Sequence, residues 1–264
     1  MLEARSGSAG SARTFHSACQ WRSRVTAGTK PHEVVDEQAQ AERFVHSLLP
    51  RDGVLSVLDI KARDQRFEIR SPIYTVSVDV LQAERGHRPD ADECRVMDLE
   101  RVDLEGEAYD VVLCSNVLEH AGDPLALFPI MRDALKPGGI LVTLFPNVVS
   151  LKSLVVRLTP GSVHRWFYVR VLRAGPGSHP ARAVHSFSLR RSSLLSHARS
   201  GGWKVEYFCA YEGPVQKSVR HRIGLRGRPW RLAVVLTRVL TLGFLTAEET
   251  GIIAVFTKIS SGPL

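Results

Sequence analysis

Cysteine is scarce in this sequence, and the few cysteines show no metal-binding pattern. The chain of 264 residues has four of them, Cys19, Cys94, Cys114 and Cys209. No two have the paired spacing of a zinc site, and the histidines are scattered, so we expect no metal. The pattern favours reduced structural thiols, which are typical of the cytoplasm, and we expect a cytoplasmic location.

Long apolar runs are also missing. A membrane-spanning helix needs about 18 or more consecutive apolar residues. The nearest candidate, residues 232–245, is interrupted by Arg238. The sequence therefore predicts a protein that is not integral to a membrane, and its composition, 44% hydrophobic and 23% charged, is ordinary for a globular chain.

Acidic residues are nearly absent from one part of the second half. Residues 150–245 contain 17 Lys or Arg and only Glu206 and Glu212, a local balance of +15 within a net charge of +8. Such asymmetry suggests an anionic partner, whether a diphosphate-bearing acceptor, a membrane surface or nucleic acid. A solvated basic surface is the alternative explanation.

The most informative stretch reads as a strand, a helix, a turn and a second strand. Val111–Cys114 are a short apolar run of the kind that a buried parallel strand needs. Asp123-Pro124 are typical of a helix start, and the helix repeats apolar residues at Leu125, Phe128, Met131 and Leu135. The turn at 136–139 and the strand at 140–145 follow, so two parallel strands flank one crossover helix.

Further elements surround this stretch. The patterns predict a helix over 34–49, strands over 55–60, 74–80 and 94–97, a helix over 189–199, and strands over 203–211 and 251–259. Residues 1–32 are rich in Ser, Ala, Gly and Arg and lack a hydrophobic period, so we expect disorder there.

The segment 216–245 is basic at first and then amphipathic. Its apolar residues available to one face are Trp230, Leu232, Val235, Leu236, Val239 and Leu240. An amphipathic helix in a globular chain usually covers a sheet, so we expect docking on the core. Peripheral docking on a membrane is the alternative.

Three acids occur at regular intervals at the ends of the first three strands: Asp59 and Asp79 close the first and second, and Asp98 follows the third. Asp59 and Asp79 are 20 residues apart, and Asp98 follows 19 residues later. Ligands of an open parallel sheet bind beyond the carboxyl ends of its strands. An acid at the end of the second strand can accept hydrogen bonds from both hydroxyls of a ribose. Asp79 is therefore the strongest candidate for binding a nucleotide-like cofactor.

Together with the phrase VLCSNVLEH at 112–120 and the Pro-Gly-Gly at 137–139, this pattern resembles the class I S-adenosylmethionine-dependent methyltransferases over roughly residues 54–147. The resemblance implies an α/β fold with a Rossmann-like, doubly wound, mostly parallel seven-stranded sheet, an antiparallel last strand and insertions in the C-terminal half. It implies S-adenosyl-L-methionine as cofactor. The cofactor-binding candidates are Asp59, Lys61, Ala62, Asp79, Val80, Asp98, Leu99, Ser115 and Asn116, with Asp98 at the adenine and Ser115 and Asn116 at the methionine end.

The sequence departs from the family in two places. The glycine-rich turn expected after the first strand is replaced by residues 59–65, Asp-Ile-Lys-Ala-Arg-Asp-Gln, which contain no glycine. The side chains of Lys61 and Arg63 must then point away from the pocket or enter it. Pro129 is expected to remove a hydrogen bond and kink the crossover helix.

The function predicted is methyl transfer to a small-molecule or glycan-like acceptor, with O-methylation favoured. His120, just past the fourth strand, is the candidate general base, because histidine titrates near neutral pH; a histidine that only hydrogen-bonds the local backbone is the alternative. A catalytically inactive binding module with a basic, aromatic surface is the rival function. Nucleic-acid methylation ranks last, because no Asn-Pro-Pro-aromatic motif follows the fourth strand.

The predicted organisation is a tail at 1–32 and one methyltransferase-like domain at 33–264. Within that domain we expect a cofactor-binding core, a lid or acceptor insertion, a core helix and strand, a basic amphipathic insertion, and a last strand with its tail, at 33–147, 148–183, 184–213, 214–245 and 246–264.

Overall fold

The structure is a computed structural model, and it describes residues 37–50, 53–61, 67, 69, 73–79, 91–96, 106, 108–160, 162 and 186–259. The predicted tail at 1–32 and most of the predicted insertion at 148–183 lie outside these residues. None of the helices in the described ranges combines the length and the apolar character needed to cross a bilayer.

One mixed sheet organises the chain, in the order β3-β2-β1-β4-β5-β7-β6. Its strands are β1 Leu55–Lys61, β2 Ile73–Asp79, β3 Glu93–Val96, β4 Tyr109–Ser115, β5 Leu135–Pro146, β6 Trp203–Tyr211 and β7 Gly251–Lys258. Strands β1 to β5 pair in parallel, whereas β7 runs antiparallel to both β5 and β6. The predicted α/β class is confirmed.

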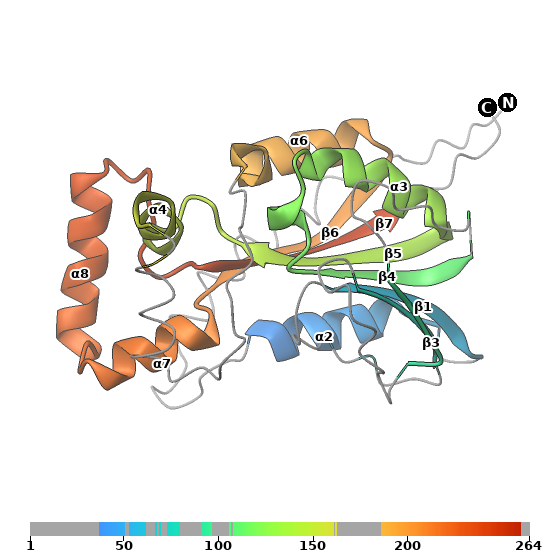
Figure 1. The fold of residues 1–264 in the computed structure, drawn as a ribbon, viewed down its shortest axis with the longest axis horizontal. Helices are drawn as coiled ribbons and strands as arrows, with labels where there is room; N and C mark the ends of the chain where they lie inside the picture. Colours follow the sequence, from blue (N-terminus) through green and yellow to red (C-terminus); the bar gives the residue numbers. More distant parts are fainter. Residues whose placement is uncertain are drawn as a thin grey trace, which may run out of the picture.

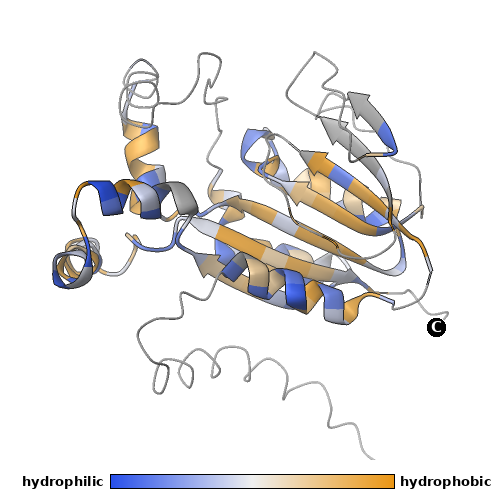
Figure 2. Ribbon diagram, turned by 90° about the horizontal axis from the view of Figure 1, so that it is seen from below, coloured by the Kyte–Doolittle hydropathy of each residue, from blue (hydrophilic) through white to orange (hydrophobic). Residues whose placement is uncertain are grey.

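Helices cover both faces of the sheet (Figure 1). α3 Leu127–Ala134 and α6 Arg191–Ser200 lie on one face, and α2 Glu37–Leu48 lies on the other. β4 is buried on both sides, which explains its nearly continuous apolar run. Figure 2 shows the same apolar character along the central strands. The sheet thus separates two apolar cores.

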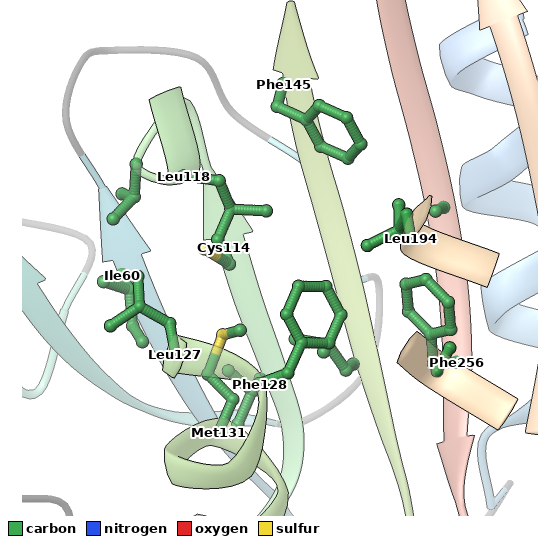
Figure 3. Close-up of a cluster of buried hydrophobic side chains, with 14 of the residues drawn as sticks. Ile60, Cys114, Leu118, Leu127, Phe128, Met131, Phe145, Leu194 and Phe256 are labelled. Carbon is green, nitrogen blue, oxygen red and sulfur yellow. The ribbon is translucent and has the colours of Figure 1, made fainter. Parts of the chain in front are cut away.

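Phe128 of α3 is the centre of the larger core. Its ring is fully buried and meets the rings of Trp203 and Phe256 edge-on, with centroids 6.3 and 5.7 Å away. Figure 3 shows Phe128 and Met131 of α3 pointing toward β4, β5 and β7. The helical spacing predicted for Phe128 and Met131 is confirmed by their burial, whereas Leu135 is buried as the first residue of β5 and not as part of the helix.

Pro129 affects the crossover helix differently from the expected kink. The predicted single helix consists of a 3-10 turn, η3 Pro124–Ala126, followed by α3, and Pro129 is the third residue of α3. Because the first N–H groups of a helix have no intrahelical partner, the missing N–H interrupts no bond of α3. Asp123 caps η3 as predicted, since its side chain accepts the N–H of Leu125 at 3.1 Å.

α3 ends at Ala134, just before the predicted turn at 136–139, but β5 begins earlier than predicted, at Leu135. Leu135 pairs with Tyr109, and the register then jumps to Ile140 opposite Val111. The residues at 136–139, between these two pairs, form a bulge in the ladder of β4 and β5, and Gly138 has a φ of 76°.

Three helices gather at the end of the molecule toward which β5 points (Figure 1). These are α4 Leu151–Leu158, α7 Pro214–Arg222 and α8 Gly227–Leu240, here called the helical layer. Asn147, just after β5, fastens this layer: its side-chain amide donates to the carbonyl of Glu249 at 3.0 Å, and its carbonyl accepts the hydroxyl proton of Ser153 at 2.7 Å.

The predicted packing of 216–245 on the core is wrong. The helix forms, but Leu232, Val235, Leu236, Val239 and Leu240 are all exposed. The residue that α8 buries is Val234, and Trp230 is half-buried. α8 has two apolar stripes, and the smaller one, which includes Trp230 and Val234 one turn apart, faces inward because Trp230 packs against Arg220 of α7.

Candidate functional site

The carboxyl ends of the parallel strands bring three of the predicted site residues to one edge. Lys61, the last residue of β1, is opposite Asp79, the last residue of β2. It is also opposite Ser115, the last residue of β4, on its other side. The backbone therefore places these three residues side by side where an open parallel sheet binds ligands.

Asn116 turns the chain out of the sheet directly after β4. Its φ of 55° lies in the left-handed region, which asparagine tolerates better than most residues. Its backbone N–H donates to the carbonyl of Leu144 at 2.8 Å. Ser115 is buried at 1% exposure, whereas Asn116 is partly exposed at the edge.

His120 lies in a short 3-10 turn, η2 Leu118–His120, close to this edge. Its backbone N–H donates to the carbonyl of Val117 at 2.9 Å, and its side chain is half-buried. The position just beyond β4 agrees with the sequence prediction. The catalytic role assigned to His120 stays a prediction.

Glu119 is a buried carboxylate that the sequence reasoning missed. It is 5% exposed, as is Asp59 near the end of β1. A glutamate between Leu118 and a histidine looks like an ordinary polar neighbour, and only its burial makes it unusual, since acids are seldom buried.

The two buried acids act on Cys114. Its thiol is 1% exposed, and burial raises its pKa far above the usual range; the nearby carboxylates of Glu119 and Asp59 raise it further. Cys114 is therefore a neutral core thiol, in agreement with the structural role predicted for it.

Several predicted residues lie outside the described residues. They are Ala62, Val80, Asp98 and Leu99, together with the rest of the glycine-free turn from Ala62 to Gln65. For Lys61 and Asp79 the structure describes the backbone only. The direction of the Lys61 side chain therefore stays a prediction.

Acidic and hydroxyl residues lie at or near the strand ends that form this edge. Asp79 ends β2 and Ser115 ends β4, with Lys61 of β1 between them, which is where an open parallel sheet binds nucleotide-like ligands. Asp59, which the sequence placed at the end of β1, lies two residues before that end and is buried. Among the described residues no three His, Cys, Asp or Glu side chains cluster as metal ligands.

Comparisons with known proteins bear on the fold and on part of the sequence. Residues 71–143 match the protein-family model described as a methyltransferase domain. The matched segment contains β2, β3, β4 and most of β5, and therefore two of the three strand ends that meet at the edge.

Curated relatives match over a similar length. A ubiquinone biosynthesis O-methyltransferase from Cereibacter sphaeroides is 42% identical over 69 residues, and one from Dinoroseobacter shibae is 39% identical over 69 residues. Each match covers 23% of this chain and 28% of the relative.

A solved structure extends the similarity to most of the fold. The S-adenosylmethionine-dependent methyltransferase from Mesorhizobium loti superposes with a TM-score of 0.50 at 15% identity, covering 85% of this chain and 99% of that one. At this identity the likeness shows the fold alone. Residues 71–143 are thus similar to a methyltransferase domain, and most of the chain shares its fold with an S-adenosylmethionine-dependent methyltransferase.

Proposed function

We propose that this chain transfers a methyl group from S-adenosylmethionine to a small-molecule or glycan-like acceptor, with oxygen as the favoured nucleophile. The observation that carries the proposal is the strand register, which places Asp79 and Ser115 on either side of Lys61 within a fold matched as a methyltransferase domain. The similarity to ubiquinone biosynthesis O-methyltransferases supports oxygen.

Each residue at the edge has a distinct task in this proposal. The carboxylate of Asp79 accepts hydrogen bonds from the ribose hydroxyls, and Ser115 and Asn116 line the methionine end. Asp98 contacts the adenine. Bound there, S-adenosylmethionine supplies a methyl group on a sulfonium centre. The protein contributes orientation of the reacting groups, which lowers the barrier by itself.

His120 is the proposed general base for a neutral hydroxyl acceptor. An alcohol is a weak nucleophile until it loses its proton, and an imidazole titrates in the right range to accept that proton. The half-buried position of His120 just after β4 leaves its side chain partly accessible to solvent, as proton removal requires.

A methyl-transfer assay tests the proposal. Purified protein is incubated with S-adenosylmethionine and a panel of phenols, sugars and glycosides, and S-adenosylhomocysteine is measured. Asp79→Ala is expected to raise the cofactor concentration needed for half-maximal rate about tenfold or more, because charged hydrogen bonds are lost.

His120→Ala is expected to lower turnover about a hundredfold or more while leaving cofactor affinity unchanged. His46→Ala, in α2 on the face opposite α3, is a matched histidine control and should leave turnover unchanged. Full turnover in His120→Ala would remove His120 as the base.

One observation supports the rival function, an inactive binding module: residues 59–65 contain no glycine. Those glycines would let the backbone approach the cofactor, whereas Lys61 and Arg63 carry long side chains. Binding of S-adenosylmethionine separates the two functions, because the binding module does not bind it.

A further inference from the structure

The outer face of α8 is an exposed aliphatic stripe. Leu232, Val235, Leu236, Val239 and Leu240 recur at intervals of three and one, so they lie on one side of the helix. Their exposed fractions range from 48% for Leu236 to 80% for Leu240. Contiguous apolar surface of this kind on a globular protein usually marks an interaction site.

The apolar surface continues beyond both ends of α8. Ile223, just before the helix, is 68% exposed, and Leu242 and Phe244, just after it, are 97% and 63% exposed. Leu242 has a φ of 51°, an unusual conformation for a leucine, and its side chain is almost entirely in solvent. Exposed aliphatic or aromatic groups therefore occur before α8, along it from Leu232 to Leu240, and after it.

The fold does not need this outer stripe, because α8 is held from its inner side. Arg220 of α7 forms a two-point ion pair with Glu212, with N–O distances of 2.8 Å, and its guanidinium lies 4.9 Å from the centroid of the Trp230 ring. Val234, one turn beyond Trp230, is buried. The inner contacts thus fix the helix and leave the outer face to solvent.

The charges around the stripe are almost all positive. Residues 214–245 contain seven Lys or Arg and no Asp or Glu. Arg231 and Arg238 are seven residues apart and lie along one border of the stripe, and Arg228 precedes Leu232 by one turn. Arg238 pairs with Glu248 at 2.7 Å, while Arg228 and Arg231 are exposed.

We propose that the outer face of α8 docks on an anionic lipid surface, with its aliphatic side chains in the interface and its arginines at the lipid phosphates. A basic amphipathic helix lying in the plane of the interface has this combination of features. A second copy of the chain would bring two such positive faces together, which like-charge repulsion opposes. Nucleic acid would leave the aliphatic stripe without a partner.

Docking in this way would set the carboxyl edge of the sheet near the membrane. Figure 1 shows α8 beyond the end of β5, at the same end of the molecule as the candidate site. The proposal does not depend on methyl transfer, because the stripe and its charges are independent of the edge residues.

Vesicle sedimentation of the full chain tests the proposal. Binding to phosphatidylcholine vesicles that contain phosphatidylglycerol is expected, with much weaker binding to phosphatidylcholine alone. The double variant Leu236→Gln, Val239→Gln should bind about tenfold or more weakly. Its matched control, Val54→Gln, changes an aliphatic residue of similar exposure, 68%, next to β1 and should bind like the native chain.

The arginines are tested separately. Arg228→Gln and Arg231→Gln should each weaken binding to the anionic vesicles about fivefold, and added salt should weaken it further. Because all of these side chains are exposed, the circular dichroism spectrum should not change. The proposal would be overturned if the chain did not sediment with anionic vesicles, or if it bound both vesicle types equally. A dimer in solution that the double variant dissociates would also overturn it.

Discussion

The central sheet and helix α8 contain the same kinds of aliphatic residue but expose them to opposite extents. Ile253 and Val255 of β7 are fully buried, whereas Val239 and Leu240 of α8 are 65% and 80% exposed. The difference shows that apolar residue type alone does not determine burial. A strand between two paired neighbours, as β7 is, buries both faces, but a helix at the end of the molecule buries one stripe.

Truncation of the core should show the largest effect of this difference. Phe128→Ala removes a fully buried ring that contacts Trp203 and Phe256, and it should lower the free energy of unfolding by about 3–5 kcal/mol. Leu236→Ala, at 48% exposure, should change it by no more than about 0.5 kcal/mol. Urea denaturation of both variants measures the contrast, and equal losses would abolish the distinction between the two regions.

The inner attachment of α8 should have an intermediate effect. Arg220→Ala removes two charged hydrogen bonds to Glu212 and the stacking on Trp230, and leaves Glu212 half-buried without its cation. The expected loss in unfolding free energy is about 1.5–3 kcal/mol. Arg228→Ala, at an exposed position of α8, is the matched control with little change. If Arg220→Ala changed the unfolding free energy as little as Arg228→Ala does, the inner contacts would not hold α8.

The smallest effect expected is a change of the unfolding free energy with pH, which comes from Cys114 of β4. The raised pKa of Cys114 keeps its thiol protonated in the folded state, while the unfolded thiol ionises above about pH 8.5. The unfolded state then binds fewer protons, so Cys114 lowers stability as pH rises, by up to about 1.4 kcal/mol per pH unit.

Denaturation of the native chain and of Cys114→Ala between neutral and alkaline pH measures this slope. The native chain should lose stability relative to the variant above the pKa of the unfolded thiol. Parallel profiles would contradict the burial of Cys114 in the larger core.

The sequence predicted the sheet better than it predicted the helical layer. Strand β6 has the predicted bounds, β1 ends one residue later than predicted, and β2 and β3 are each shifted by one residue, because apolar runs bounded by breakers determine strands locally. The packing of α8 was mispredicted because two apolar stripes share its sequence, and the sequence does not tell which of them contacts α7, as Trp230 does through Arg220.

The candidate site was predictable in position and less so in detail. The predicted ends of the strands placed candidates at one edge, and the register joins Lys61, Asp79 and Ser115 there. Burial of Glu119 was not predictable, since it depends on how η2 folds back after β4. No periodicity encodes such a turn.

The measurement that tests the central claim most directly is calorimetric titration of the chain with S-adenosylhomocysteine, which needs no knowledge of the acceptor. We expect saturable binding in the micromolar range, weakened about tenfold or more in Asp79→Ala and unchanged in the Leu236→Gln, Val239→Gln variant. No binding at millimolar ligand by a folded native chain would contradict methyl transfer and leave the chain as a binding module.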